Sequence, residues 1–252
     1  MREVPINIPP FKKIISLYRV SSTMDVAYML GRLGERDIIV EAEEQWAGRG
    51  KGENRWFSDD NSLTFSLILD GGFIYKSSLL SILAGVMVRR GIISATGIPI
   101  KLKWPNDIIF NGKKLGGILG EDRGKFVIIG IGININQKSF PSWLDMPISL
   151  YQIIGKENRK DDILLSILRE FSLGLEGFIN GDERLINEWK RSCDILGKKI
   201  AGYEIPKEEG IVIDLASDGA LIVETRDGRK RRIYSTEELY RVERRYRWRE
   251  NT

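Results

Sequence analysis

The sequence predicts an α+β fold, in which a mixed, mainly antiparallel sheet has helices packed on it and a small β-barrel follows. Helical periodicity at 23–33 and 76–92 is interleaved with apolar runs of strand length. After Ile195, short β-type runs alternate with tight turns such as Asp218-Gly219, which is typical of consecutive hairpins. This change of character predicts two domains, residues 1–193 and residues 194–252.

Composition limits the classes of protein and site. The chain has 252 residues, of which 42% are hydrophobic and 29% charged, as in an ordinary folded protein. No apolar run approaches the roughly 20 residues that span a bilayer, and the first residues lack the apolar core of a signal peptide. One cysteine, Cys193, and no histidine argue against disulfides, zinc sites and imidazole catalysis. We therefore expect a cytoplasmic protein without a membrane partner, in which any catalysis uses cations, carboxylates, backbone amides or Mg²⁺.

The first strand and helix meet at a group of small polar residues. The run 13–20 is a predicted strand, Ser22 and Thr23 are good N-caps for the helix that follows, and Gly34 suits its C-terminus. A helix N-terminus at the end of a strand is a ready site for a polar or anionic group. Plain helix capping is the alternative.

The stretch 45–56 combines three glycines, three cations and two tryptophans between two predicted strands, 37–42 and 63–69. Glycines let backbone amides come close to a ligand, and arginine or lysine beside such amides makes a cradle for phosphate or carboxylate. The alternative is an ordinary solvated loop.

The next segments supply a buried helix and a lysine-bearing strand. The helix predicted at 76–92 has apolar residues on nearly all of its sides, which indicates a buried helix, and Gly91 is expected to end it. In the strand after it, Lys101 and Lys103 share one face if Leu102 faces the core.

Strands that contain glycines follow, and two helices complete the first domain. Asn111-Gly112 is a strong hairpin signal between strands at 107–110 and 115–121, and a third strand covers 126–136. Glycines inside strands mark bulges or places where a ligand or a backbone comes close. Helical periodicity returns over 161–179 and 183–192.

Together, the 45–56 loop, Lys103 and the glycine-containing strands describe a concave site with bare backbone walls and several cations. Such a site suits an anionic substrate and the phosphates of a nucleotide. The chain has no Walker sequence, and Gly130-x-Gly132 lacks the third glycine and the helix of a dinucleotide fingerprint.

Five motifs occur in an order and spacing that resemble biotin–protein ligases over about residues 15–140. The motifs are Ser22-Thr23, Gln45 with Gly48-Arg49-Gly50 and Trp56, Lys103-Trp104-Pro105-Asn106-Asp107, Gly117-Ile118-Leu119 with Glu121, and Gly130-Ile131-Gly132-Ile133-Asn134. The resemblance implies a class II synthetase-like catalytic domain that binds biotin and ATP, and a small C-terminal SH3-like domain. It is to the monofunctional type, without an N-terminal DNA-binding domain.

The resemblance implies a reaction in two steps. Biotin and MgATP give biotinyl-5′-AMP and pyrophosphate, and the biotinyl group then passes to a lysine of a biotin carboxyl carrier protein or domain. The implied enzyme is an AMP-forming biotin–[biotin carboxyl carrier protein] ligase that does not bind DNA. A homodimer paired through a sheet edge is left open.

The resemblance also assigns the site residues. Lys103 and Arg49 are the implied catalytic residues, with Lys103 touching both the biotin carboxylate and the attacked phosphate. The implied biotin site consists of Ser22, Thr23, Gln45, Gly48, Arg49, Lys103, Gly117, Gly130 and Gly132. The implied ATP and adenylate site consists of Arg49, Gly50, Lys51, Arg55, Trp56, Lys103 and Asn134, with Trp56 against adenine. Either Asn106 or Asp107 could assist Mg²⁺.

The sequence departs from the family in the 45–56 loop and in the first helix. Lys51 stands where relatives usually have a second arginine, and it cannot form the planar bidentate fork of arginine. We expect Arg55 to compensate in part. Met24 stands where asparagine is common, which removes one polar group near biotin.

Two other functions are considered. Lipoate–protein ligases share the adenylate chemistry, but the Trp-Pro of the lysine motif and the Gly-Arg-Gly loop favour biotin. A nucleic-acid-binding protein could use the β-barrel and the arginine-rich C-terminal tail. The net charge of only +4, from 39 cations and 35 anions, disfavours that alternative.

Overall fold

The computed structural model describes residues 1–71, 77–202 and 205–234. The arginine-rich tail named above lies outside these residues.

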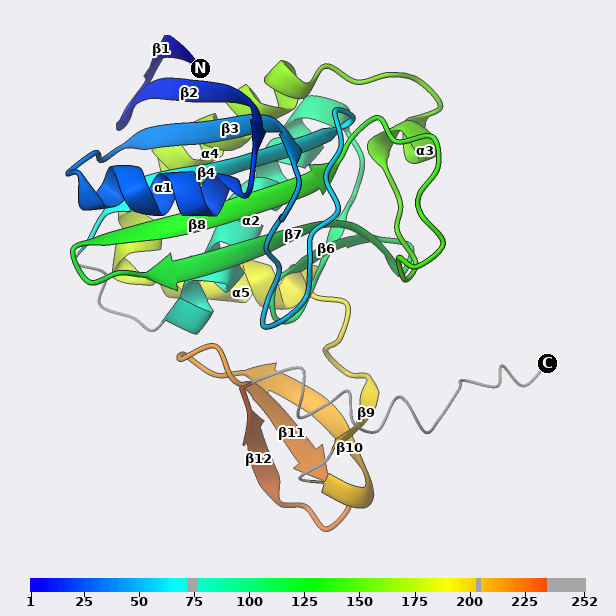
Figure 1. The fold of residues 1–252 in the computed structure, drawn as a ribbon. Coiled ribbons are helices and arrows are strands. Elements are labelled where there is room, and N and C mark those ends of the chain that lie inside the picture. The colour runs from blue at the N-terminus through cyan, green and yellow to red at the C-terminus, as the bar shows by residue number, and fades with distance from the viewer. Residues whose placement is uncertain (72–76, 203–204, 235–252) are drawn as a thin grey trace.

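An eight-stranded mixed sheet forms the centre of the larger part of the molecule (Figure 1). Its strand order is β1-β2-β3-β4-β8-β7-β6-β5, and every neighbouring pair is antiparallel except β2 with β3. The predicted mixed, mainly antiparallel sheet is therefore confirmed. The strands are β1 Arg2–Ile8, β2 Phe11–Val20, β3 Ile38–Gln45, β4 Ser62–Asp70, β5 Lys101–Lys103, β6 Asp107–Phe110, β7 Lys113–Asp122 and β8 Phe126–Asn134.

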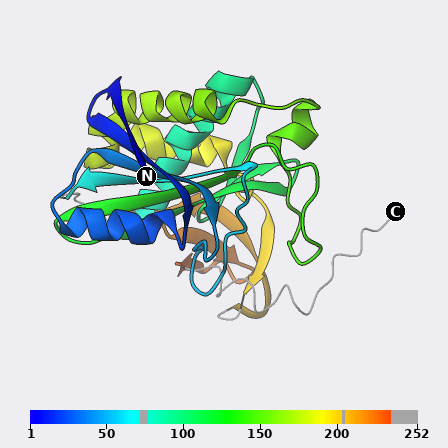
Figure 2. The same cartoon turned by 45° about the horizontal axis from the view of Figure 1, so that its top comes forward.

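Helices cover both faces of this sheet (Figure 2). On one face, α1 (Thr23–Arg32) packs on β3, β4 and β8, and the side chain of Ser22 caps it as predicted. The other face carries α2 (Ser77–Thr96), and α4 (Lys160–Asn180) and α5 (Glu183–Ser192) pack on α2. A short helix, α3 (Leu150–Ile154), follows β8. The α1 face is therefore the one left partly open for a ligand.

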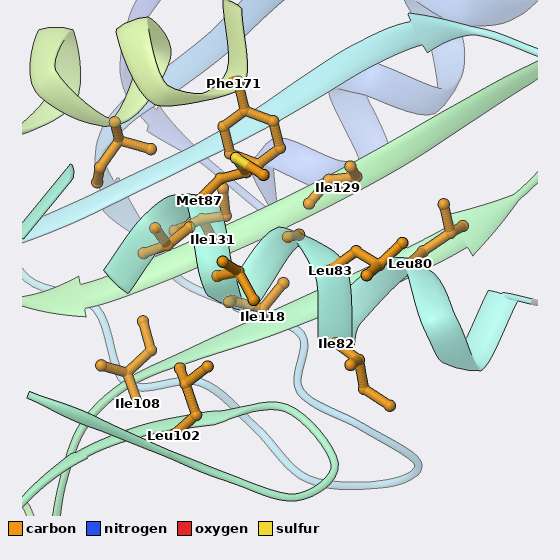
Figure 3. Close-up of a cluster of buried hydrophobic side chains, with 14 of the residues drawn as sticks. Leu80, Ile82, Leu83, Met87, Leu102, Ile108, Ile118, Ile129, Ile131 and Phe171 are labelled. Carbon is orange, nitrogen blue, oxygen red and sulfur yellow. The ribbon is translucent and has the colours of Figure 1, made fainter. Parts of the chain in front are cut away.

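Helix α2 is the centre of the hydrophobic core (Figure 3). Its window Leu79–Thr96 is long and apolar enough for a membrane span, but 67% of it is buried between the sheet and the other helices. The prediction that Gly91 ends this helix is wrong, because α2 continues to Thr96. Gly91 instead marks a close helix crossing, where a Cβ would lie 2.5 Å from the Cα of Ile167 in α4.

A second, four-stranded antiparallel sheet follows in the order β12-β11-β10-β9. Gly219 has a φ of +85° in the predicted Asp218-Gly219 turn, and Gly228 has a φ of +80° in the turn between β11 and β12. Apolar residues of this sheet, Val212 among them, belong to the same buried cluster as Leu102 and Trp104 of the larger part. The fold class is confirmed, whereas the boundary at residue 193 stays a prediction. The strands are β9 Lys199–Gly202, β10 Ile205–Leu215, β11 Leu221–Thr225 and β12 Lys230–Ile233.

Candidate functional site

The N-terminus of α1 forms one wall of the site. Gln45, at the end of β3, accepts hydrogen bonds through Oε1 from the Thr23 amide at 2.7 Å and from its hydroxyl at 3.2 Å. The hydroxyl of Ser66 donates to Thr23 Oγ1 at 2.9 Å. Ser22 accepts from the amide of Met24 at 3.3 Å. The structure thus brings the predicted Ser22 and Thr23, which are buried, together with the half-buried Gln45.

Strand register forms a continuous floor beside this wall. Lys103, Asp107, Gly117, Gly132 and Thr64 are successive cross-strand partners on five adjacent strands. Directly opposed residues of antiparallel strands share one face. With strands spaced by about 4.8 Å, the row spans roughly 14 Å from Lys103 to Gly132. Its cationic end and its bare glycine centre therefore lie on one surface.

Two side chains cover the glycines of the floor. A Cβ added to Gly132 would lie 2.4 Å from Cε2 of Trp56, and one added to Gly130 would lie 2.6 Å from Sδ of Met24. Any side chain at these positions would therefore displace Trp56 or Met24. Trp56, expected against adenine, lies on glycines expected to contact biotin. Its Nε1 is buried and has no hydrogen-bond partner among the residues that the structure describes.

The 45–56 loop is a small hairpin folded over the floor. The amide of Trp56 donates to the carbonyl of Gly48, and that of Gly50 donates to the carbonyl of Asn54, both at 2.9 Å. Arg49 and Arg55 are opposed in an antiparallel bridge. A cavity of about 350 Å³ lies between this hairpin and the end of β7; it is lined by Ala47, Gly48, Arg49, Gly50, Gly52, Asn54, Arg55, Leu119 and Glu121.

Arg49 holds the hairpin against the rest of the domain. Its guanidinium contacts Glu121 of β7 at 2.5 Å and Asp25 of α1 at 3.3 Å. The Glu121 side chain is only 15% exposed and also pairs with Arg123. A charge held by a partly buried partner is screened less than a surface pair. Glu121 thus stands where a substrate anion would compete for Arg49.

Lys114 is a cation of the site that the sequence analysis missed. Its ammonium lies 2.6 Å from Asp107 Oδ1, and 3.7 Å from the position of a Cβ on Gly117. Simple alternation along β7 would place Lys114 and Gly117 on opposite faces. The register between β6 and β7 shifts between Ile108 and Ile109, and such a bulge turns the side chain onto the floor.

Lys103 and Lys51 lie near Trp104, at the cationic end of the row. As predicted, Leu102 is buried and Lys103 lies on the other face of β5. The ammonium of Lys51 in the hairpin lies over the Trp104 ring, 5.5 Å from its centroid. The structure therefore brings Lys51, where the hairpin departs from the family sequence, toward the strand that carries Lys103.

Asn134, two residues after Gly132 at the end of β8, lies beside the floor. The Asn134 side chain is 5% exposed, and its amide donates to the carbonyls of Ile148 at 3.0 Å and Lys114 at 3.3 Å. Gln137, which the sequence analysis did not single out, is 2% exposed and donates to Ser62 at 2.7 Å. Within the described part of the chain, its buried Oε1 has no hydrogen-bond partner. This end of the site is held by tertiary contacts.

Asn106 and Asp107 can supply only part of a Mg²⁺ coordination shell. Asn106 Nδ2 donates to the carbonyl of Ile118 at 2.9 Å, and the Asp107 carboxylate already pairs with Lys114. Within the described ranges, no three His, Cys, Asp or Glu side chains are grouped to hold a metal ion. The donors fit an ion that takes most of its ligands from nucleotide phosphates and water.

Known proteins resemble this chain in sequence and in fold. Residues 16–136 match the biotin/lipoate A/B protein ligase family. The bifunctional ligase/repressor BirA of Bacillus subtilis is 35% identical over 231 residues, which cover 86% of this chain and 71% of that protein. The chain belongs to the biotin/lipoate A/B protein ligase family. The biotin–[acetyl-CoA-carboxylase] ligase of Mycobacterium tuberculosis is 27% identical and matches 74% of this chain and 73% of its own length.

Among solved structures, the biotin protein ligase from Aquifex aeolicus in complex with biotin and ATP has the same fold. Its TM-score is 0.76 at 30% identity, over 89% of this chain and 96% of that one. The fold predicted from the family resemblance is therefore confirmed over most of the chain.

Proposed function

We infer that this member of the family is an ATP-dependent biotin–protein ligase, which activates biotin as biotinyl-5′-AMP and transfers it to a lysine of a carrier protein. The observation that carries the inference is the likeness to the Aquifex aeolicus ligase in complex with biotin and ATP. The named biotin ligases among the relatives favour biotin over lipoate as the substrate.

We propose that biotin lies with its ureido ring toward the N-terminus of α1. Thr23 and Gln45 already hydrogen-bond to each other there, and a buried ureido group needs such partners in an otherwise apolar pocket. The fused rings would lie near Gly117, Gly130 and Gly132. Trp56 and Met24 cover Gly132 and Gly130 too closely for even a methyl group, so both side chains would move aside for the rings and would then form apolar walls of the pocket.

We propose that two lysines at the other end of the row supply the positive charge that the reacting anions need. The first step brings a carboxylate to the α-phosphate, so two anions must approach each other, and oriented cations stabilise the charge that spreads in the transition state. Lys114 lies beside the glycine floor and would meet the biotin carboxylate. Lys103 lies farther along the row and would meet the phosphates while remaining within reach of the reacting group.

The hairpin would supply the remaining phosphate contacts. Arg49 and Arg55 are directly opposed, so their side chains project from the same face of the hairpin. This supports the expectation that Arg55 replaces part of the arginine function lost at Lys51. Arg49 would exchange Glu121 for a substrate phosphate, and Gly50 would offer its backbone. Closure of the hairpin over the mixed anhydride would exclude water.

Mg²⁺ is a proposed co-substrate of ATP. When bound, it would neutralise phosphate charge, with Asp107 or Asn106 as partial ligands. Asn134 stays a proposed nucleotide contact, although its amide nitrogen is engaged with two carbonyls.

The proposed partner is a biotin carboxyl carrier protein or domain, and the proposed location is the cytoplasm, to which the single cysteine is suited. Relatives of this chain include bifunctional ligase/repressors. We propose that this chain acts without binding DNA, and we leave a homodimer as a proposal for sedimentation measurements.

ATP–pyrophosphate exchange tests the function directly. The purified chain is expected to exchange label between pyrophosphate and ATP when biotin is present, and to transfer labelled biotin to a carrier domain. Exchange with lipoate but not with biotin would refute the proposed substrate. Steeply salt-dependent DNA binding without biotin-dependent exchange would support the non-enzymatic alternative.

A further inference from the structure

Trp104 connects the Lys103 strand to the small C-terminal sheet. Its side chain is 2% exposed, and its indole Nε1 donates a hydrogen bond of 2.9 Å to the carbonyl of Gly219. Gly219 lies in the turn between β10 and β11, which is closed by hydrogen bonds between Ala216 and both Gly219 and Ala220. The acceptor is therefore held in place by its own turn.

Strand β5 packs on α2 and α5 through the buried side of Leu102, but it has few backbone partners. It has three residues and is the last strand of the eight-stranded sheet, so within that sheet only β6 pairs with it. On its other edge, the amide of Asp194 donates to the carbonyl of Leu102 at 2.8 Å. Asp194 belongs to the segment that leads from α5 into the small sheet. The Asp194–Leu102 bond and the Trp104–Gly219 bond therefore both link the placement of β5 to the C-terminal part of the chain.

Trp104 also meets the hairpin that covers the site. The Lys51 ammonium lies over its ring, in the position of a cation–π contact. One side chain thus follows Lys103 in sequence, contacts the hairpin and is hydrogen-bonded to the small sheet.

We propose that Trp104 is a positioning residue through which the small sheet sets the place of Lys103. The proposal deepens the adenylate-forming function above and rests on it. Catalytic groups must be held within about 0.5 Å of the productive geometry. A three-residue edge strand has few backbone bonds to hold it, and the bond from Trp104 to Gly219 adds a constraint directly beside Lys103. Trp104 itself touches no substrate in this proposal.

Trp104→Phe tests the proposal because phenylalanine keeps an aromatic ring and removes the N–H donor. We expect kcat of biotin-dependent ATP–pyrophosphate exchange to fall about five- to tenfold, with KM for biotin unchanged. Lys190→Gln is the matched control. It removes a 2.6 Å ion pair between α5 and Asp214 of the small sheet without touching β5, so kcat should change less than twofold. In a Lys103→Ala background, Trp104→Phe should cause no further loss if it acts through Lys103.

A second readout does not depend on catalysis. Cys193 is the only cysteine of the chain, and its backbone forms an isolated parallel β-bridge with Leu102 of β5. If Trp104→Phe loosens β5, the Cys193 thiol should react faster with iodoacetamide in this variant than in the wild type or in Lys190→Gln. Absence of exchange in the wild type would overturn both this proposal and the function. Wild-type exchange combined with unchanged kcat in Trp104→Phe, or with an equal further loss in the Lys103→Ala background, would overturn this proposal alone.

Discussion

Gly132 is the residue on which the shape of the floor most directly depends. The backbone there is approached so closely by Trp56 that a Cβ would lie 2.4 Å from the ring. At Gly117, a Cβ would meet nothing closer than 3.6 Å, which is ordinary contact. The two glycines share one surface and differ in how much space lies above them.

Gly132→Ala should raise KM for biotin at least tenfold, because the added methyl displaces Trp56 from the floor. The folded state should persist, since the indole can swing outward with its hairpin. Gly117→Ala is the comparison and should raise KM less than Gly132→Ala, because its methyl displaces no protein side chain. Exchange kinetics and thermal unfolding of both variants are the measurements, and equal KM values in both would contradict the role given to Trp56.

Lys103 and Lys114 should both prove essential for the first step. Removal of a preorganised donor typically costs about 2.7–4 kcal/mol in the barrier, a 10²–10³-fold loss of rate. We expect losses of that size for Lys103→Ala and Lys114→Ala, with KM for biotin more affected at Lys114. Lys113→Ala, an exposed neighbour, is the control. Labelled-biotin transfer by each variant is the assay, and full activity in Lys103→Ala would remove that residue from the site.

At the scale of elements, α2 and α4 cross at a point where no side chain fits. A Cβ on Gly91 would lie 2.5 Å from Cα of Ile167, whereas a Cβ on Gly85 of the same helix would meet only side chains, at 3.6 Å or more. The same substitution should therefore have opposite effects at the two positions.

Gly91→Ala should destabilise the protein by about 1–3 kcal/mol, because the helices must move apart. Gly85→Ala should be neutral or stabilise by up to about 1 kcal/mol, since alanine favours helix over glycine. Urea unfolding of both variants gives the comparison. A loss of stability at Gly85 as large as that at Gly91 would show that the crossing is not the cause.

For the whole molecule, the junction between the two sheets should be sensitive to alkali. Burial raises the pKa of the Cys193 thiol from its ordinary 9.0 to about 11. As the pH rises, the thiol therefore ionises in the unfolded state before it ionises in the folded state. The stability that depends on the neutral thiol is complete below pH 9 and is lost as the pH rises toward 11.

The free energy of unfolding of the wild type should accordingly fall between pH 9 and pH 11 more steeply than that of Cys193→Ala. Denaturant titrations across this range measure the difference between the two proteins. Parallel pH profiles would show that the thiol does not ionise on unfolding in this range.

Much of the fold was determined by local patterns in the sequence. Alternation and glycine punctuation placed the strands and the Asn111-Gly112 turn, whose residues both have positive φ as a two-residue hairpin requires. Small polar residues located the N-terminus of α1. These patterns act over a few residues, so they are visible without a structure. The role of Gly91 was misjudged because a distant contact requires this glycine. Its neighbour in space is Ile167 of α4, which lies 76 residues away in sequence.

The sequence by itself determined the family motifs, the absence of cysteine and histidine chemistry, and the set of cations available to the site. Only the tertiary structure decided which of them meet. Lys114 reaches the floor because a bulge reverses its face, and Trp56 lies on Gly132 because the 45–56 hairpin folds over β8. Trp104 reaches Gly219 across 115 residues of sequence. Periodicity determines which way a side chain faces within its own element, whereas register and packing determine what it faces.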